Sequence, residues 1–337
     1  MKIMANKVFK RFISISILLL LFISSFIFAV AIGAVKIPWE EIIEIIFFGV
    51  NTDNRVILMD IRLPRVMIAA ILGAGLAAVG GVMQGIFMNP LVDSYTLGMS
   101  SGAALGAVFS IVTGIGIFGY ATTGVFAFIG TVSTLFLVYF LSKTKNRVSI
   151  NTLLLAGVAV SYFLSSIISF VMMMNKHKLD QIVFWTMGSL SSSTWQKFII
   201  SSSIIIPGVL LLNIFGRELN IMSLGEESAH YIGVDVERLK YILLGICSLI
   251  VGAVVSTGGT IGFLGLVAPH IVRLIWGSDY RRLIPYSAII GGSILMLADA
   301  LGRVLIQPSE IPVGVMTSIM GGPFFVFLLR KQKSKGA

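Results

Sequence analysis

The sequence predicts an all-α polytopic membrane protein of about ten transmembrane helices with both termini in the cytoplasm. Of its 337 residues, 56% are hydrophobic and only 12% are charged, whereas about a quarter of the residues in soluble domains are charged. The apolar residues also occur in runs of about 16 to 24, close to the roughly 20 residues that a helix needs to cross a bilayer. The sequence lacks the alternating segments of about 10 residues that are typical of a membrane β-barrel.

Ten apolar spans follow one another along the chain, and no long soluble domain interrupts them. The spans are residues 12–32, 66–87, 97–112, 123–141, 153–174, 198–215, 241–256, 260–276, 283–301 and 312–329. An even number of crossings places both termini on one side of the membrane. Residues 1–337 are therefore predicted to form a single transmembrane domain.

The basic residues predict which side faces the cytoplasm. If the N-terminus is inside, the inner segments carry about two thirds of the 25 Lys and Arg residues, as the positive-inside rule requires. The same rule accounts for the net charge of +10, so we expect membrane lipid around the chain and no nucleic acid.

The first span has a second interpretation. Its basic flank, its apolar run and the small residues Ala29-Val30-Ala31 resemble a signal peptide with a cleavage site. We expect the span to be retained, because the run is long and its removal would leave an odd number of crossings.

The remaining polar residues are concentrated in three segments. Residues 35–65 and 175–197 are predicted outside, and residues 216–240 form a cytoplasmic loop. The 35 glycines fit a helical bundle in lipid, where small residues let helices approach closely. The single cysteine, Cys247, cannot form an internal disulfide.

Enzyme chemistry finds little support in the residue pattern. No G-x-x-x-x-G-K-[ST] loop is present to hold ATP, so any ATPase belongs to another subunit. Glu227 and His230 form a single E-x-x-H pair, whereas a di-iron site in a helical bundle needs two such pairs and two further glutamates. His270 and Asp299 are isolated, and we interpret both as packing or hydrogen-bonding residues. We expect no catalytic residue, no metal site and no cofactor on this chain.

The cytoplasmic loop contains a predicted short helix. Ser223 and Glu226 have the spacing of a capping box, and Gly233 supplies a helix stop. A plain connection between two spans needs no such helix, so we predict that it presents a rigid surface to a partner. The alternative is an interfacial helix that lies on lipid through Leu224, Tyr231 and Ile232.

Eight stretches in order resemble the type II ABC importer permeases of the FecCD family, which serve iron-siderophores, haem and cobalamin. The strongest is the run from Gly259 to Arg273, GTIGFLGLVAPHIVR. The others are RLPR at 62–65; Gln84 with NPL at 89–91 and LG at 97–98; LLLAG at 153–157; WTMGS at 185–189; LGEE at 224–227 with Ala229 and GV at 233–234; AD at 298–299 with Arg303; and EIPVG at 310–314 with GGPF at 321–324.

The resemblance implies a set of partners. Permeases of this family have ten helices per subunit and form a homodimer with the pathway on its two-fold axis. They work with two cytoplasmic ATPase subunits, which bind the ATP, and with an extracytoplasmic substrate-binding protein. The residues implied in ATPase coupling are Ser223, Leu224, Gly225, Glu226, Glu227, Ala229 and Gly233. Glu226 and Glu227 are expected to be exposed and to pair with basic residues of the ATPase.

Two further sets of site residues come from the same resemblance. Arg62, Arg65 and Arg303 match arginines that dock the binding protein; lipid-phosphate anchoring is the alternative for Arg62 and Arg65. Asn89, Pro90 and Leu91 match residues of a cytoplasmic gate; an ordinary helix end is the alternative here. Ser94 stands where the family commonly has proline, so the family's exact loop shape is not carried over to this segment.

The sequence thus predicts the permease subunit of a binding-protein-dependent ABC importer in the bacterial plasma (inner) membrane. The cargo implied is an iron chelate, either ferric siderophore or haem, or else cobalamin. The cargo would cross by alternating access through a cavity lined by glycine, serine and threonine. The alternatives are an ion-coupled secondary transporter, which would need inverted repeats, and a membrane-embedded enzyme.

Overall fold

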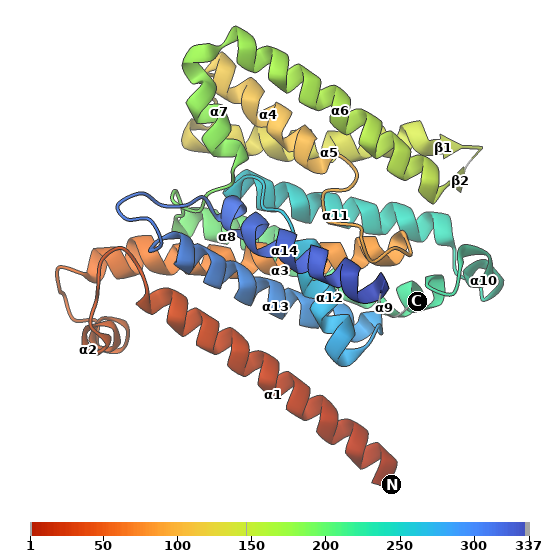
Figure 1. Ribbon diagram of the computed structural model, residues 1–337, viewed down its shortest axis with the longest axis horizontal. Coiled ribbons are helices and arrows are strands. Elements are labelled where there is room, and N and C mark those ends of the chain that lie inside the picture. Colours follow the sequence, from red (N-terminus) through yellow and green to blue (C-terminus); the bar gives the residue numbers. More distant parts are fainter. Residues whose placement is uncertain (1, 146, 334–337) are drawn as a thin grey trace.

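The computed structural model describes residues 2–145 and 147–333, and almost all long elements in it are helices (Figure 1). Seven helical segments in this part of the chain are long and apolar enough to cross a membrane. They are α1 (Lys2–Ala31), η2 with α3 (Ile57–Arg62 and Leu63–Ile86), α5 (Thr122–Ser142), α6 (Ile150–Met174), α8 (Trp195–Ile214), α11 (Val236–Gly258) and α13 (Tyr280–Gly302). Three shorter apolar helices are α4 (Met99–Thr113), α12 (Leu264–Trp276) and α14 (Val313–Lys333). Each coincides with one predicted span, which confirms the helical membrane fold.

Short elements connect these helices. They are α2 (Trp39–Ile43), the π-helix η1 (Glu44–Phe48), the 3₁₀ turns η3 (Gly119–Ala121) and η4 (Lys176–Lys178), α7 (Leu179–Thr186), α9 (Gly216–Met222), α10 (Glu226–Tyr231), and an antiparallel hairpin of β1 (Lys143–Thr144) and β2 (Arg147–Val148). The predicted outer loop at 175–197 therefore contains a helix, α7.

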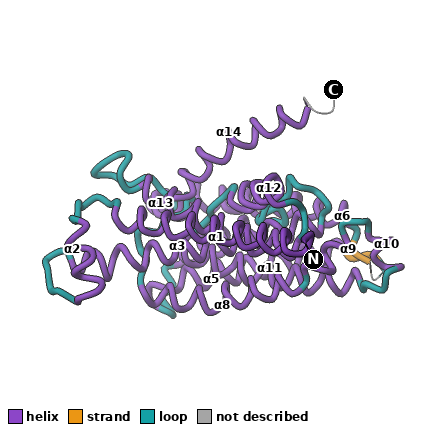
Figure 2. Tube along the Cα trace, turned by 90° about the horizontal axis from the view of Figure 1, so that it is seen from below, coloured by secondary structure: helices purple, strands orange, loops and turns teal. Residues whose placement is uncertain are grey.

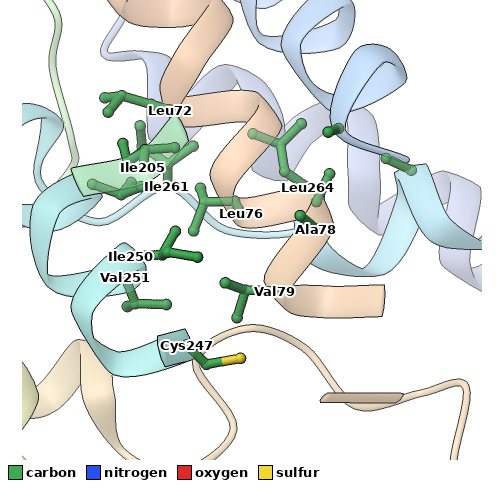
Figure 3. Close-up of a cluster of buried hydrophobic side chains, with 14 of the residues drawn as sticks. Leu72, Leu76, Ala78, Val79, Ile205, Cys247, Ile250, Val251, Ile261 and Leu264 are labelled. Carbon is green, nitrogen blue, oxygen red and sulfur yellow. The ribbon is translucent and has the colours of Figure 1, made fainter. Parts of the chain in front are cut away.

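Three helices form the centre of the bundle. Most of α3, α11 and α13 is buried, whereas less than a quarter of α1, α6 and α8 is buried. Figure 3 shows the core between α3 and α11: Leu76 and Val79 face Ile250 and Val251, and Ile205 of α8 joins them. The exposed outer helices are apolar, as expected of surfaces that face lipid or another subunit.

Glycines allow the central helices to touch through their backbones. A Cβ added at Gly73 of α3 would overlap the carbonyl oxygen of Gly291 on α13, and one added at Gly291 would overlap the carbonyl oxygen of Gly73. Close contact through small residues is the packing mode predicted for helices in lipid.

The two ends of the bundle differ in their elements. The N-terminal end of α1, the C-terminal end of α14, α9, α10 and the β-hairpin lie towards one end, and α2 lies at the other (Figures 1 and 2). This arrangement agrees with an even number of crossings. The assignment of the α10 end to the cytoplasm stays a prediction.

Two predicted boundaries were wrong. The second span begins near Ile57, not at residue 66, because Arg62 and Arg65 are buried and bonded within the chain. The eighth helix begins at Leu264, because Gly259 has φ +70° and Phe263 has φ +67°, so the signature run starts as a non-helical turn.

Candidate functional site

A cluster of charged side chains joins α3 to α13 at the end of the bundle opposite α10. The Arg65 guanidinium places Nη2 2.9 Å and Nε 3.0 Å from Oδ1 of Asp299. Arg303 lies one helical turn after Asp299, and its Nε is 3.2 Å from Oδ2 of that carboxylate. Asp299 thus satisfies a neighbouring helix, as predicted. Because α3 contributes the arginine and α13 the carboxylate, this ion pair joins the two central helices at their ends opposite α10.

Two further residues extend this cluster. Nη1 of Arg65 lies 2.8 Å from Oε2 of Glu310, in the loop between α13 and α14. Arg62 donates from Nη1 to the carbonyl oxygen of Val30 at 2.9 Å and from Nη2 to that of Val35 at 2.7 Å. The cluster holds three cations and two carboxylates, so it carries one excess positive charge.

The structure brings the three predicted docking arginines together but turns them inwards. Arg62, Arg65 and Arg303 are only 4%, 7% and 4% exposed. Docking requires accessible guanidinium groups, whereas in this arrangement carbonyl and carboxylate oxygens of the chain occupy them. Glu310, whose side chain is 37% exposed, is the member of the cluster that faces outwards most. The docking role itself stays a prediction.

The predicted helix of the coupling loop is present as α10, with six residues in place of about nine, and a second short helix, α9, precedes it. The capping box was wrong: Ser223 follows α9, and its hydroxyl donates to the carbonyl oxygen of Asn220 at 2.6 Å. α10 begins at Glu226 after Gly225, which has φ +111° and therefore favours glycine. The helix stop is confirmed, because Gly233 has φ +95° and donates to the carbonyl oxygen of His230 at 3.0 Å.

The outer face of this segment is apolar. Leu224, Tyr231 and Ile232 are 68%, 89% and 59% exposed, while Ala229 packs inwards and is fully buried. Such a knob of exposed large side chains suits a protein cleft or the lipid interface, so both predicted roles remain for these residues. Glu227 is exposed and lies in the first turn of α10.

Glu226 has a partner inside the chain that the sequence interpretation missed. Its Oε2 lies 2.8 Å from Nζ of Lys240, which is 1% exposed. Lys240 also reaches Oε1 of Glu237 at 3.2 Å and the carbonyl oxygen of Val148 at 3.0 Å. Glu226 is therefore engaged within the chain, which leaves Glu227 as the better placed of the two glutamates for a partner subunit.

α9 is attached to the start of α13. The Asn220 amide donates to Oδ1 of Asp279 at 2.7 Å, and the backbone N–H of Tyr280 donates to Oδ1 of Asn220 at 2.9 Å. Asp279 also accepts from the backbone and side chain of Arg281. These hydrogen bonds, that of the Arg281 side chain first, hold the pKa of Asp279 well below its usual value.

The predicted gate residues lie just beyond the end of α3. The helix ends at Ile86, and Met88 then adopts φ +48°. The side-chain oxygen of Asn89 accepts from the N–H of Leu91 at 2.9 Å, which closes an Asx turn. Pro90 and Leu91 are exposed, and Ser94, at the family's proline position, donates to the carbonyl oxygen of Leu76 at 3.1 Å. The helix thus ends before Asn89 and is followed by a turn, as the alternative of an ordinary helix end also predicts, and the gating role stays a prediction.

A cavity of about 550 Å³ lies beside the turn that opens the signature run. Its wall combines hydroxyl groups and glycine with apolar side chains, and the lining residues are Tyr95, Ser100, Thr186, Met187, Thr260, Gly262, Gly314, Val315, Ser318 and Ile319. The predicted composition of a pathway, rich in glycine, serine and threonine, matches this wall. Such groups hold a cargo weakly, because no fixed charge lines the cavity.

His270 shows the packing role predicted for it. Its ring meets that of Phe324 edge-on, with centroids 6.4 Å apart.

Comparisons with known proteins agree with these features. The model of the FecCD transport family matches residues 18–331. The cobalamin import system permease protein BtuC of Halobacterium salinarum is 40% identical over 85% of this chain and 76% of its own. The hemin transport system permease protein HmuU of Yersinia pestis is 39% identical over 83% of this chain and 84% of its own. A solved inward-facing ABC transporter, provisionally assigned to the metal-chelate type, superposes with a TM-score of 0.81 and 30% identity over 93% of this chain and 97% of its own.

Proposed function

Because this chain belongs to the FecCD transport family, we propose that it imports a metal chelate as the membrane-spanning subunit of a binding-protein-dependent ABC transporter. It is a multi-pass membrane permease, in agreement with the predicted location in the inner membrane. The observation that carries the proposal is the match of fold and sequence over nearly the whole chain.

The cargo we propose is a ferric siderophore, haem or cobalamin. The similarity to a cobalamin permease and to a hemin permease is nearly equal, at 40% and 39% identity. The cavity beside the signature turn supports a large, weakly held cargo, because it offers hydroxyls and glycines without a fixed charge. A transport site of this kind lets the cargo leave again after each cycle.

The energy comes from partner subunits in this proposal. The sequence lacks a phosphate-binding loop, so ATP would bind to two separate cytoplasmic subunits. The exposed knob of Leu224, Tyr231 and Ile232 next to Glu227 would occupy a cleft in each of them. ATP binding and hydrolysis would then move α10 and switch the pathway between its outward and inward openings.

A second copy of the chain would complete the pathway. α6 exposes Leu155, Tyr162 and Phe163 at 71%, 74% and 65%, and α14 exposes Ile319 at 60%. Apolar faces of this size mark contact with lipid or protein. We propose a homodimer with these two helices at its interface, and an external binding protein that docks near the cluster of Arg62, Arg65 and Arg303.

Uptake by the reconstituted complex tests this function. The permease, its ATPase and its loaded binding protein would be placed in liposomes, and labelled cobalamin, haem and a ferric siderophore would be offered in turn. We expect import of one cargo only when ATP and the binding protein are both present. Uptake that continues with an inactivated ATPase, or that follows an ion gradient, would show a secondary transporter.

A further inference from the structure

We infer that the buried ammonium group of Lys240 transmits the motion of α10 to α6, and so couples ATP hydrolysis to opening of the pathway. Lys240 lies in the first turns of α11, at the end of the bundle that carries both α10 and the β-hairpin (Figure 1). Its three hydrogen-bond partners come from three elements: Glu226 from α10, Glu237 from α11 and Val148 from β2.

The burial of Lys240 makes these contacts strong constraints. A charge taken out of water costs several kcal/mol unless it is paired and hydrogen-bonded. Lys240 is 1% exposed, and its three N–H donors match three acceptors at 2.8, 3.0 and 3.2 Å. If α10 moved away alone, the ammonium would lose one of its two counter-charges. The hairpin and α10 are therefore expected to move together.

Val148 of the hairpin makes two hydrogen bonds to side chains of α11. Val148 presents its carbonyl oxygen to Lys240 at 3.0 Å and its N–H to Oε2 of Glu237 at 2.9 Å. β2 ends at Val148, and α6 begins two residues later at Ile150. A displacement of Lys240 thus reaches the first turn of α6 through the short main-chain segment from the buried Val148 to Ile150.

A second connection of the coupling loop runs from α9 to the start of α13. α9 is bonded through Asn220 to Asp279 and Tyr280 at the start of α13, a central helix that α3 holds by backbone contact. α6, in contrast, is mostly exposed and packs within this chain on α4 and α5, not on the central helices α3 and α13. We therefore assign α9 to the stationary part of the subunit and the path through Lys240 to the moving part.

This inference rests on the proposed function, and its test is a coupling ratio. Lys240→Met keeps the aliphatic stem but removes the charge. Arg238→Met, an exposed position in the same turn, is the matched control. In liposomes with ATPase and binding protein, we expect Lys240→Met to assemble and hydrolyse ATP, while cargo imported per ATP falls about tenfold, within the range of one coupling free energy. Arg238→Met should keep the wild-type ratio.

A second variant separates transmission from folding. Glu226→Gln leaves Lys240 its bonds to Glu237 and Val148, so the fold keeps its buried pair, while the charged link to α10 is lost. We expect normal affinity for the ATPase and a ratio between those of wild type and Lys240→Met. In the double variant the two losses should not add, because both remove the same link.

The outcomes are distinct. If the wild-type complex imports nothing with ATP, the proposed function fails. If the wild type imports and both Lys240→Met and Glu226→Gln keep its ratio, the inference about Lys240 is overturned while the proposed function stands. If Lys240→Met does not assemble, the Glu226→Gln ratio decides alone: a reduced ratio supports the link, and an unchanged one refutes it.

Discussion

The Asp299 carboxylate of α13 accepts from Nε of Arg65 on α3 at 3.0 and 3.1 Å, in a pair whose side chains are 2% and 8% exposed. The two residues are 234 positions apart in the sequence. Asp299 is the carboxylate that Arg65 and Arg303 share, and its removal would leave the three buried arginines of the cluster with only Glu310 to balance them.

Asp299→Ala is expected to lower the free energy of unfolding by about 3–5 kcal/mol, the usual cost of an uncompensated buried charge. Glu310→Gln is the matched control, because Glu310 is partly exposed and a pair of this kind contributes about 1 kcal/mol or less. Unfolding by denaturant in mixed micelles measures both. Equal losses for the two variants would contradict the central role of Asp299.

Glu310→Gln should instead change docking, if Arg65 receives the binding protein. The variant removes the carboxylate that now occupies Nη1 of Arg65, so the outer end becomes more positive. We expect association of the binding protein to become roughly tenfold faster at low salt, and the difference to shrink as salt screens the field. Surface plasmon resonance at several ionic strengths measures this rate. An unchanged rate at every salt concentration would argue against docking on Arg65.

Gly73→Ala is expected to destabilise the bundle by about 1–3 kcal/mol, since the new Cβ overlaps the Gly291 carbonyl oxygen and must push α3 and α13 apart. Gly245→Ala on α11 is the control: nothing lies within 4 Å of its added Cβ. The control should be neutral or gain up to about 1 kcal/mol from helix propensity. Denaturant titration of the two variants side by side tests this difference, and similar effects would be evidence against the close contact.

The stability of the wild type should fall at acid pH, partly through Asp279. The hydrogen bond from Arg281, together with that from Asn220, lowers the pKa of Asp279 in the folded chain. Its stabilisation is therefore complete above the unfolded value of about 4 and fades as the pH falls through the folded value. Asp279→Ala should lose about 1 kcal/mol at neutral pH as a helix N-cap and show a flatter acid limb. Thermal unfolding between pH 3 and 7 measures the two curves; identical slopes would contradict the assignment.

Much of the fold was predictable because the bilayer constrains it. Apolar runs of membrane-spanning length mark helices directly, so all ten were found, and the parity of the crossings agrees with the arrangement of the ends. The boundary at Ile57 could not be found in this way, because Arg62 and Arg65 look like loop residues until their partners are known. Those partners, Val30 and Asp299, lie on other helices.

The candidate site was predictable in part, for a similar reason. The Gly233 stop is a local signal and was correct, whereas Ser223 and Glu226 fit a local motif that the structure does not use. Gly225 adopts a positive φ, so α10 begins at Glu226. The Glu226 carboxylate then pairs with Lys240 and does not cap the helix through Ser223. Lys240 itself counted only as one of the basic residues on the cytoplasmic side. Its role depends on Val148, which lies 92 positions away.

The hold on Val148 acts through its peptide groups and not through its side chain. Replacement of this residue by any amino acid other than proline, which lacks the N–H, would leave both bonds possible, but insertion or deletion of a single residue between Ser142 and Ile150 would shift the register and break them. In related chains the amino-acid sequence of this hairpin is therefore expected to vary, while its length is expected to stay constant.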